Sequence, residues 1–82
     1  MDVKEEKMEK VKKILAEVLE IPYEDINEET SMESCASWTS LALVTILDRL
    51  ETEFDTEFDV QEAIEMDSVK AIKEILEEKG II

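Results

Sequence analysis

The sequence predicts an all-α protein, a small bundle of four helices with a long loop after the first helix and a short third helix. Two observations carry this prediction. The 82 residues include one Gly and one Pro, whereas sheets need frequent turns that these residues favour. Apolar residues recur at steps of three and four along most of the chain, which is the helical period. The length suits one domain, residues 1–82, and a hydrophobic content of 44% suffices for a folded core.

A helix and a long loop are expected first. The helix should span residues 3–19, where four apolar residues keep the helical period, namely Met8, Val11, Leu15 and Val18. Pro22 ends this pattern, and residues 21–37 should form the loop. A short turn is expected at residues 30–33, where Thr-Ser-Met-Glu has the form of a helix capping box. A loop of this length more often has a function than not.

The second helix is expected over residues 40–53. Its apolar face contains five residues at helical spacing, Leu41, Val44, Leu47, Leu50 and Phe54. Asp59 and Glu62 have the spacing of a capping box, which predicts a short third helix that ends near Glu65.

The fourth helix should begin after Asp67 or Ser68, either of which can cap it, and should end at Gly80. Four apolar residues are expected to face inward from it: Val69, Ile72, Ile75 and Leu76.

The chain is strongly acidic, with 23 Asp and Glu against 9 Lys and Arg and a net charge of −14. Residues 21–67 contain fourteen acidic residues and one basic residue, so they hold −13 of this charge. This charge argues against nucleic acid and anionic membranes as partners, because both need basic side chains to bind. Basic protein surfaces are favoured instead.

Several features argue against an enzyme, a metal centre or export. The chain has no His, so no Ser-His or Cys-His pair and no His-containing zinc site is available. Residues 55–66 resemble a calcium loop but lack its Gly and its final Glu, which predicts at most loose cation binding and no specific metal site. Cys35 is the single cysteine, and no apolar stretch suits a signal peptide or a membrane span. We therefore expect a cytoplasmic protein in which Cys35 is structural.

One segment departs from the charged composition of the rest. Residues 34–47 contain no charge, although 39% of the chain is charged. Within this segment Trp38, Thr39 and Ser40 stand where the loop meets the second helix. The N–H groups at a helix start favour a phosphate on or near Ser40. Alternatively, Thr39 or Ser40 is simply an N-cap, the more frequent role of such hydroxyls. Trp38 either anchors a partner or packs over the end of the first helix.

Residues 37–41, Ser-Trp-Thr-Ser-Leu, resemble the Gly-x-Asp-Ser-Leu motif of acyl carrier proteins. Residues 52–55, Thr-Glu-Phe-Asp, resemble the Glu-Glu-Phe-Asp stretch of that family, and residues 11–15 resemble its first helix. The resemblance covers nearly the whole chain, without a gap from Ser31 to Phe58. It therefore also implies a bundle of the acyl-carrier type.

The resemblance implies that Ser40 carries a covalent 4′-phosphopantetheine, with Trp38, Thr39 and Leu41 beside it. The thiol of this group would hold acyl cargo as a thioester. Partners would be a phosphopantetheinyl transferase and the basic surfaces of acyl-processing enzymes, and the carrier would act as a monomer. The second helix would be the docking helix. Inward residues of the last three helices would part around an acyl chain, although each of them singly is more often a plain core residue: Leu43, Val44, Leu47, Ile64, Met66 and Ile72.

Two departures from the family distinguish this chain. Thr39 replaces the Asp of the motif and Ser37 replaces its Gly. The second helix is less acidic than in carriers of general fatty acid synthesis, and three residues form its acidic face, Asp48, Glu51 and Asp55. These departures indicate a specialised fatty acid, polyketide or related pathway. The alternative is an unmodified helical adaptor for basic protein partners that has kept the fold but lost the prosthetic group. Ser68 follows an Asp as the family serine does, but it stands too near the end of the chain and is expected to be a cap.

Overall fold

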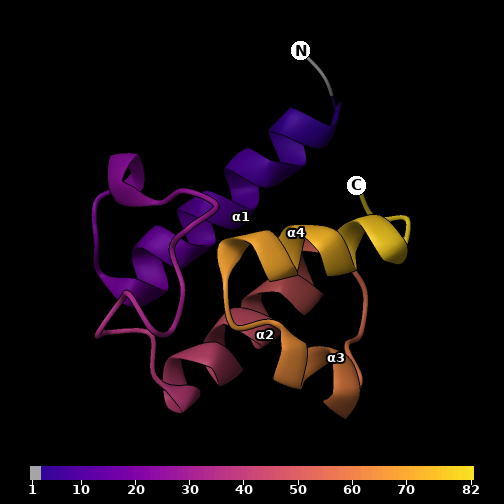
Figure 1. The fold of residues 1–82 in the computed structure, drawn as a ribbon. Helices are drawn as coiled ribbons and strands as arrows, with labels where there is room; N and C mark the ends of the chain where they lie inside the picture. Colours follow the sequence, from indigo (N-terminus) through magenta and orange to yellow (C-terminus); the bar gives the residue numbers. More distant parts are fainter. Residues whose placement is uncertain (1–2) are drawn as a thin grey trace.

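The computed structural model describes residues 3–82, which form four α-helices and one 3₁₀ helix (Figure 1). The elements are α1 (Val3–Leu19), η1 (Tyr23–Asp25), α2 (Ser40–Phe54), α3 (Val60–Glu65) and α4 (Val69–Glu78). Within these residues there is no strand, so the predicted all-α bundle with a long first loop and a short third helix is confirmed. None of the described helices combines the length and apolar character needed to cross a bilayer.

The core lies where α1, α2 and α4 meet the long loop. In Figure 1, α4 passes in front of α2, and the loop between α1 and α2 covers one side of the bundle. The core contains fourteen buried apolar residues among those described: Met8, Val11, Ile14, Leu15, Leu19, Ile26, Trp38, Ile46, Leu50, Met66, Val69, Ile72, Ile75 and Leu76. All four residues predicted to face inward from the last helix are among them.

Side-chain caps set the starts of three helices, largely as the sequence predicts. Thr39 caps α2, and Ser68 caps α4 by accepting the N–H of Ala71 at 3.0 Å. Asp59 and Glu62 form the predicted capping box of α3. After α4, Gly80 adopts a φ of 74°, which a glycine tolerates without strain.

The long loop differs from its prediction. The 3₁₀ helix η1 was not expected, and the turn lies at Ser31–Ser34 rather than at residues 30–33. It shifts because Ser31 and Ser34 bond each other's backbone N–H, at 3.0 and 3.2 Å. The Thr30 hydroxyl instead accepts the N–H of Asn27 at 3.1 Å. Thr30 therefore closes an earlier turn and is not available as a cap.

The predicted inward face of α2 is wrong in its first half. Leu41 and Val44 are 79% and 62% exposed, whereas Ile46 and Leu50 are fully buried. Asp48 lies on the same stripe as Leu41 and Val44 at helical spacing, and this charge is the signal that the stripe faces solvent. The same error applies to Ile64 on α3, which is 65% exposed instead of inward.

Four ion pairs join different elements. Lys4 on α1 pairs with Glu77 on α4, and the other three pairs are Arg49 with Glu17 (2.8 Å), Lys73 with Glu28 (2.8 Å) and Lys79 with Glu62 (3.2 Å). The Lys73 ammonium donates to Glu28 and lowers the pKa of that carboxyl, and the same hydrogen bond raises the pKa of Lys73. The last three pairs connect α2 to α1, the loop to α4, and α3 to α4.

The rotation of α2 about its axis is testable with two Leu→Ala substitutions. Leu50→Ala should lower the free energy of unfolding by about 2–5 kcal/mol, since it opens a cavity in the core. Leu41→Ala should change it by no more than about 0.5 kcal/mol, because that side chain is exposed. Urea unfolding followed by circular dichroism measures both. Equal losses would contradict the orientation of α2.

Candidate functional site

The chain enters α2 through two tight turns. The backbone N–H of Trp38 donates to the carbonyl of Cys35 at 3.0 Å, and the backbone N–H of Thr39 donates to the carbonyl of Ser37, also at 3.0 Å. Both hydrogen bonds lie within residues 35–39, the segment that leads directly into Ser40. The start of α2 therefore has a defined position on the bundle.

An isolated β-bridge between Ser31 and Ser68 ties this loop to the start of α4. Met32 donates its N–H to Asp67 and Val69 donates to Thr30, both at 2.9 Å. Two connections that are far apart in sequence, α1–α2 and α3–α4, are thereby held side by side. No pattern in the sequence signalled this bridge, because it joins two single residues and no strand-like alternation surrounds either of them.

Ser40 is the first residue of α2, and its side chain is exposed. Thr39 precedes it as the N-cap: its hydroxyl accepts the N–H of Ala42 at 3.1 Å and its carbonyl accepts Leu43 at 2.9 Å. The N–H groups of Ser40 and Leu41 have no acceptor within the helix. The first turn contains no acidic residue. The result is an accessible hydroxyl at the positive end of a helix.

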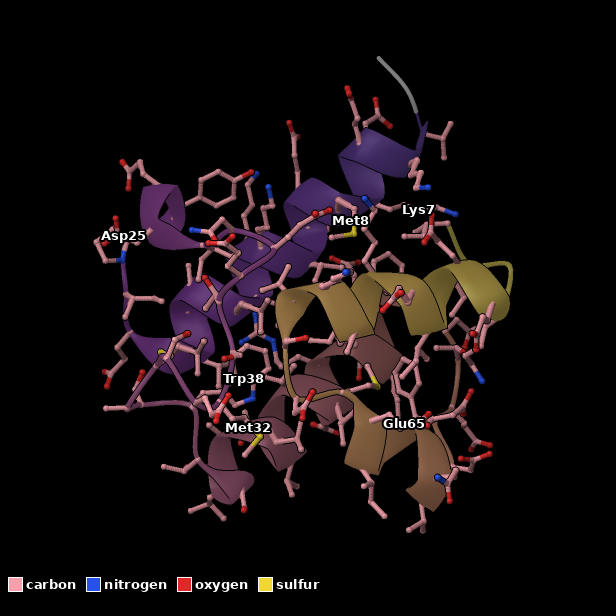
Figure 2. The ribbon with its side chains drawn as sticks, in the orientation of Figure 1. Lys7, Met8, Asp25, Met32, Trp38 and Glu65 are labelled. Atoms are coloured by element: carbon pink, nitrogen blue, oxygen red, sulfur yellow. The ribbon has the colours of Figure 1, made fainter. Side chains whose placement is uncertain are left out.

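Trp38 packs in the core and is 2% exposed, which resolves its two interpretations in favour of packing. In Figure 2 it lies between the loop, α2 and α4. Its indole Nε1 is buried without an acceptor, which costs about 1–3 kcal/mol. Burial of about 150–250 Å² of indole surface contributes about 4–6 kcal/mol. Burial of the indole contributes more than the unpaired Nε1 costs, so Trp38 stabilises the segment that leads into α2.

Cys35 is half-buried, as expected for a structural cysteine. Its Sγ lies 3.3 Å from the Ser37 hydroxyl, within hydrogen-bonding distance for sulfur. It also lines an open hollow of about 650 Å³ between the end of α1 and the loop.

An exposed stripe runs along α2 from the residue after Ser40. We define the α2 stripe as Leu41, Val44, Asp48 and Asp55, all of which are exposed. It is apolar near Ser40 and acidic toward the end of the helix. On α3, Val60 and Ile64 are also exposed, at 77% and 65%. Four of the six large apolar residues exposed in the described chain therefore lie on α2 and α3.

Glu51 was expected beside Asp48 and Asp55 but has a different environment. Its side chain is half-buried, and its carboxylate accepts the N–H of Phe58 at 2.9 Å. Glu51 thus holds the connection between α2 and α3. Arg49, the basic residue of α2, is paired with Glu17 on α1.

Among residues 3–82, no three Cys, Asp or Glu side chains converge as a set of metal ligands. The carboxylates of residues 55–59 do not form such a group.

The family model for the phosphopantetheine attachment site matches residues 9–76. The chain therefore belongs to the family of phosphopantetheine-binding carrier proteins, which bear 4′-phosphopantetheine as a covalent group. Carrier domains of this family work with phosphopantetheinyl transferases and acyl-processing enzymes, and they are generally not catalysts.

The start of α2 fits this group chemically. A phosphodiester needs an accessible hydroxyl and benefits from unpaired N–H donors with no carboxylate nearby, and the first turn of α2 provides all three. Thr39, which replaces the family Asp, keeps the capping bond without adding a negative charge.

The capping role of Thr39 is testable by substitution. Thr39→Ala should lower the free energy of unfolding by about 0.5–2 kcal/mol, because the N–H of Ala42 loses its acceptor. Thr39→Asp restores the family residue and keeps an acceptor, so it should remain close to wild type. Thermal unfolding compares the three proteins, and equal losses in Thr39→Ala and Thr39→Asp would contradict the assignment of the cap.

Proposed function

We propose that this chain is a single-domain acyl carrier protein whose 4′-phosphopantetheine is attached to the hydroxyl of Ser40. The main support is the position of Ser40, an exposed serine at the capped start of α2 in a member of the phosphopantetheine-binding family. Ser68 also caps a helix, but its hydroxyl is half-buried and bonded to Ala71.

In this proposal the residues of α2 hold the phosphodiester. The N–H groups of Ser40 and Leu41 bond its oxygens, and the helix dipole stabilises its charge. Thr39 holds the first turn in place, and Trp38 fixes the junction beneath it. When bound, the group supplies a terminal thiol that carries acyl groups as thioesters. The chain itself presents this cargo and leaves catalysis to its partners.

The α2 stripe is the proposed docking surface. Leu41 and Val44 offer exposed apolar area beside Ser40, and Asp48 and Asp55 offer negative charge further along the helix. A complementary partner has an apolar patch next to Lys or Arg side chains. Only part of α2 is acidic, which supports partners dedicated to one specialised acyl pathway.

Attachment is tested by intact mass after incubation with coenzyme A and a broad-specificity phosphopantetheinyl transferase. The wild-type chain should gain roughly 340 Da, the mass of one phosphopantetheine, and Ser40→Ala should gain nothing. The matched controls Ser37→Ala and Ser68→Ala should be modified as wild type is. A gain that survives Ser40→Ala would move the site elsewhere, and no gain in the wild type would favour an unmodified adaptor for basic proteins.

Docking is tested by reversing one charge on the α2 stripe. Asp48→Lys should lower the kcat/KM of the transferase by about fivefold, since an exposed ion pair contributes up to about 1 kcal/mol. Asp25→Lys is the matched control, because it makes the same change of net charge on η1, away from α2 (Figure 2). If both variants lose the same activity, general charge rather than the stripe guides docking.

A further inference from the structure

Packing alone holds α3 weakly. None of its six residues is buried, and Val60 and Ile64 are largely exposed. The closest helix to it is α4, whose C-terminal half lies beside it (Figure 1). Met66, directly after α3, is fully buried and anchors its far end. The N-terminal end of α3 therefore needs another attachment.

Lys79, directly after α4, provides this attachment. Its Nζ lies 3.2 Å from each carboxylate oxygen of Glu62 and 5.5 Å from the centre of the Phe58 ring. The side chains of Lys79 and Glu62 are 24% and 23% exposed, whereas the other ion pairs of residues 3–82 have side chains that are 31–64% exposed. Solvent therefore screens this pair less than the others.

Lys79 contacts residues on both sides of the first residue of α3, namely Phe58 before it and Glu62 after it. Glu62 also accepts the N–H of Asp59 at 3.0 Å in the capping box, and the N–H of Phe58 bonds to Glu51. Lys79 thus connects the end of α4 to the first turn of α3 and to the connection from α2. Lys79 is the C-cap of α4, and Gly80 follows it with a φ of 74°.

We propose that Lys79 is a latch that holds the N-terminal end of α3 against α4, and that a cation competing for Glu62 releases it. Release lets α3 swing about the buried Met66 and changes how Val60 and Ile64 stand relative to the α2 stripe. Glu62 lies within the acidic segment of residues 21–67, so a basic protein docked there supplies the competing cation. This last step rests on the proposed carrier function, whereas the latch itself does not.

Added salt should affect the Lys79–Glu62 pair and the stability of the whole bundle in opposite directions. A net charge of −14 makes the carboxylates repel one another, so added salt should stabilise the bundle by screening. The attraction between Lys79 and Glu62 is screened as well, so α3 should loosen in the same conditions. The two effects have opposite signs.

The experiment is amide hydrogen exchange on the chain without its prosthetic group, resolved by residue. In Lys79→Met, which removes the charge but keeps an unbranched side chain of similar length, the amides of α3 should exchange about fivefold faster while those of α1 and α4 keep their protection. Glu62→Gln should also speed exchange in α3, because it removes the charge that pairs with Lys79. The capping box should survive in this variant, since the Gln amide oxygen still accepts the N–H of Asp59. The matched control, Lys73→Met, breaks the pair with Glu28 and should leave α3 unchanged.

Two additions complete the test. Raising NaCl from 20 to about 200 mM, across which the Debye length falls markedly, should speed exchange in α3 of the wild type while its Tm rises. A short oligolysine, the probe for a basic partner surface, should also speed amide exchange in α3 of the wild type but not of Glu62→Gln. Oligoglutamate should leave amide exchange in α3 unchanged in both proteins. Unchanged α3 exchange in Lys79→Met, or an equal increase in all helices, overturns the latch. Failure of oligolysine alone overturns release by a basic partner. The mass of the transferase product is independent of these results, so it separates the failure of the latch from that of the carrier function.

Discussion

The rotation of α2 about its own axis is the constraint on which the rest of the structure depends. Ile46 and Leu50 are fully buried against the core, and removal of either from it would cost several kcal/mol. Once these residues face inward, the opposite side of the helix must face solvent. That side contains the α2 stripe, and Ser40 stands at its start. The packing of the core therefore decides which side of α2 is exposed.

Three of the four cations in residues 21–82 form ion pairs between elements, and the fourth, Lys70, is exposed. Arg49 joins α2 to α1, Lys73 joins α4 to the long loop, and Lys79 joins α4 to α3. Most carboxylates of residues 21–67 consequently keep their charge toward solvent. These ion pairs add to the apolar core at the junctions between elements, and most of the negative charge remains at the surface.

Thr39 shows how a departure from the family motif is tolerated. An N-cap needs a side-chain oxygen that accepts an N–H of the first turn, and the Thr hydroxyl does this at 3.1 Å. An Asp would do the same and add a negative charge beside Ser40. With Thr39 the helix start keeps its positive character, which suits a phosphodiester. The substitution therefore changes the charge at the start of α2 more than the stability of that helix.

The sequence by itself determined the four α-helices, the capping box of Asp59 and Glu62, and the family, because these follow from local periodicity, hydrogen bonding and motif spacing. It narrowed the caps of α2 and α4 to two neighbouring residues each. It also singled out Ser40. Tertiary structure fixed which apolar residues of α2 are buried, since Leu41 and Leu50 are the same residue type and the charge of Asp48 is the one local sign of the exposed stripe. It likewise decided the bridge of Ser31 to Ser68 and the contact of Lys79 with Glu62. These contacts join residues far apart in the chain, and no local pattern encodes which of many acids and bases will meet.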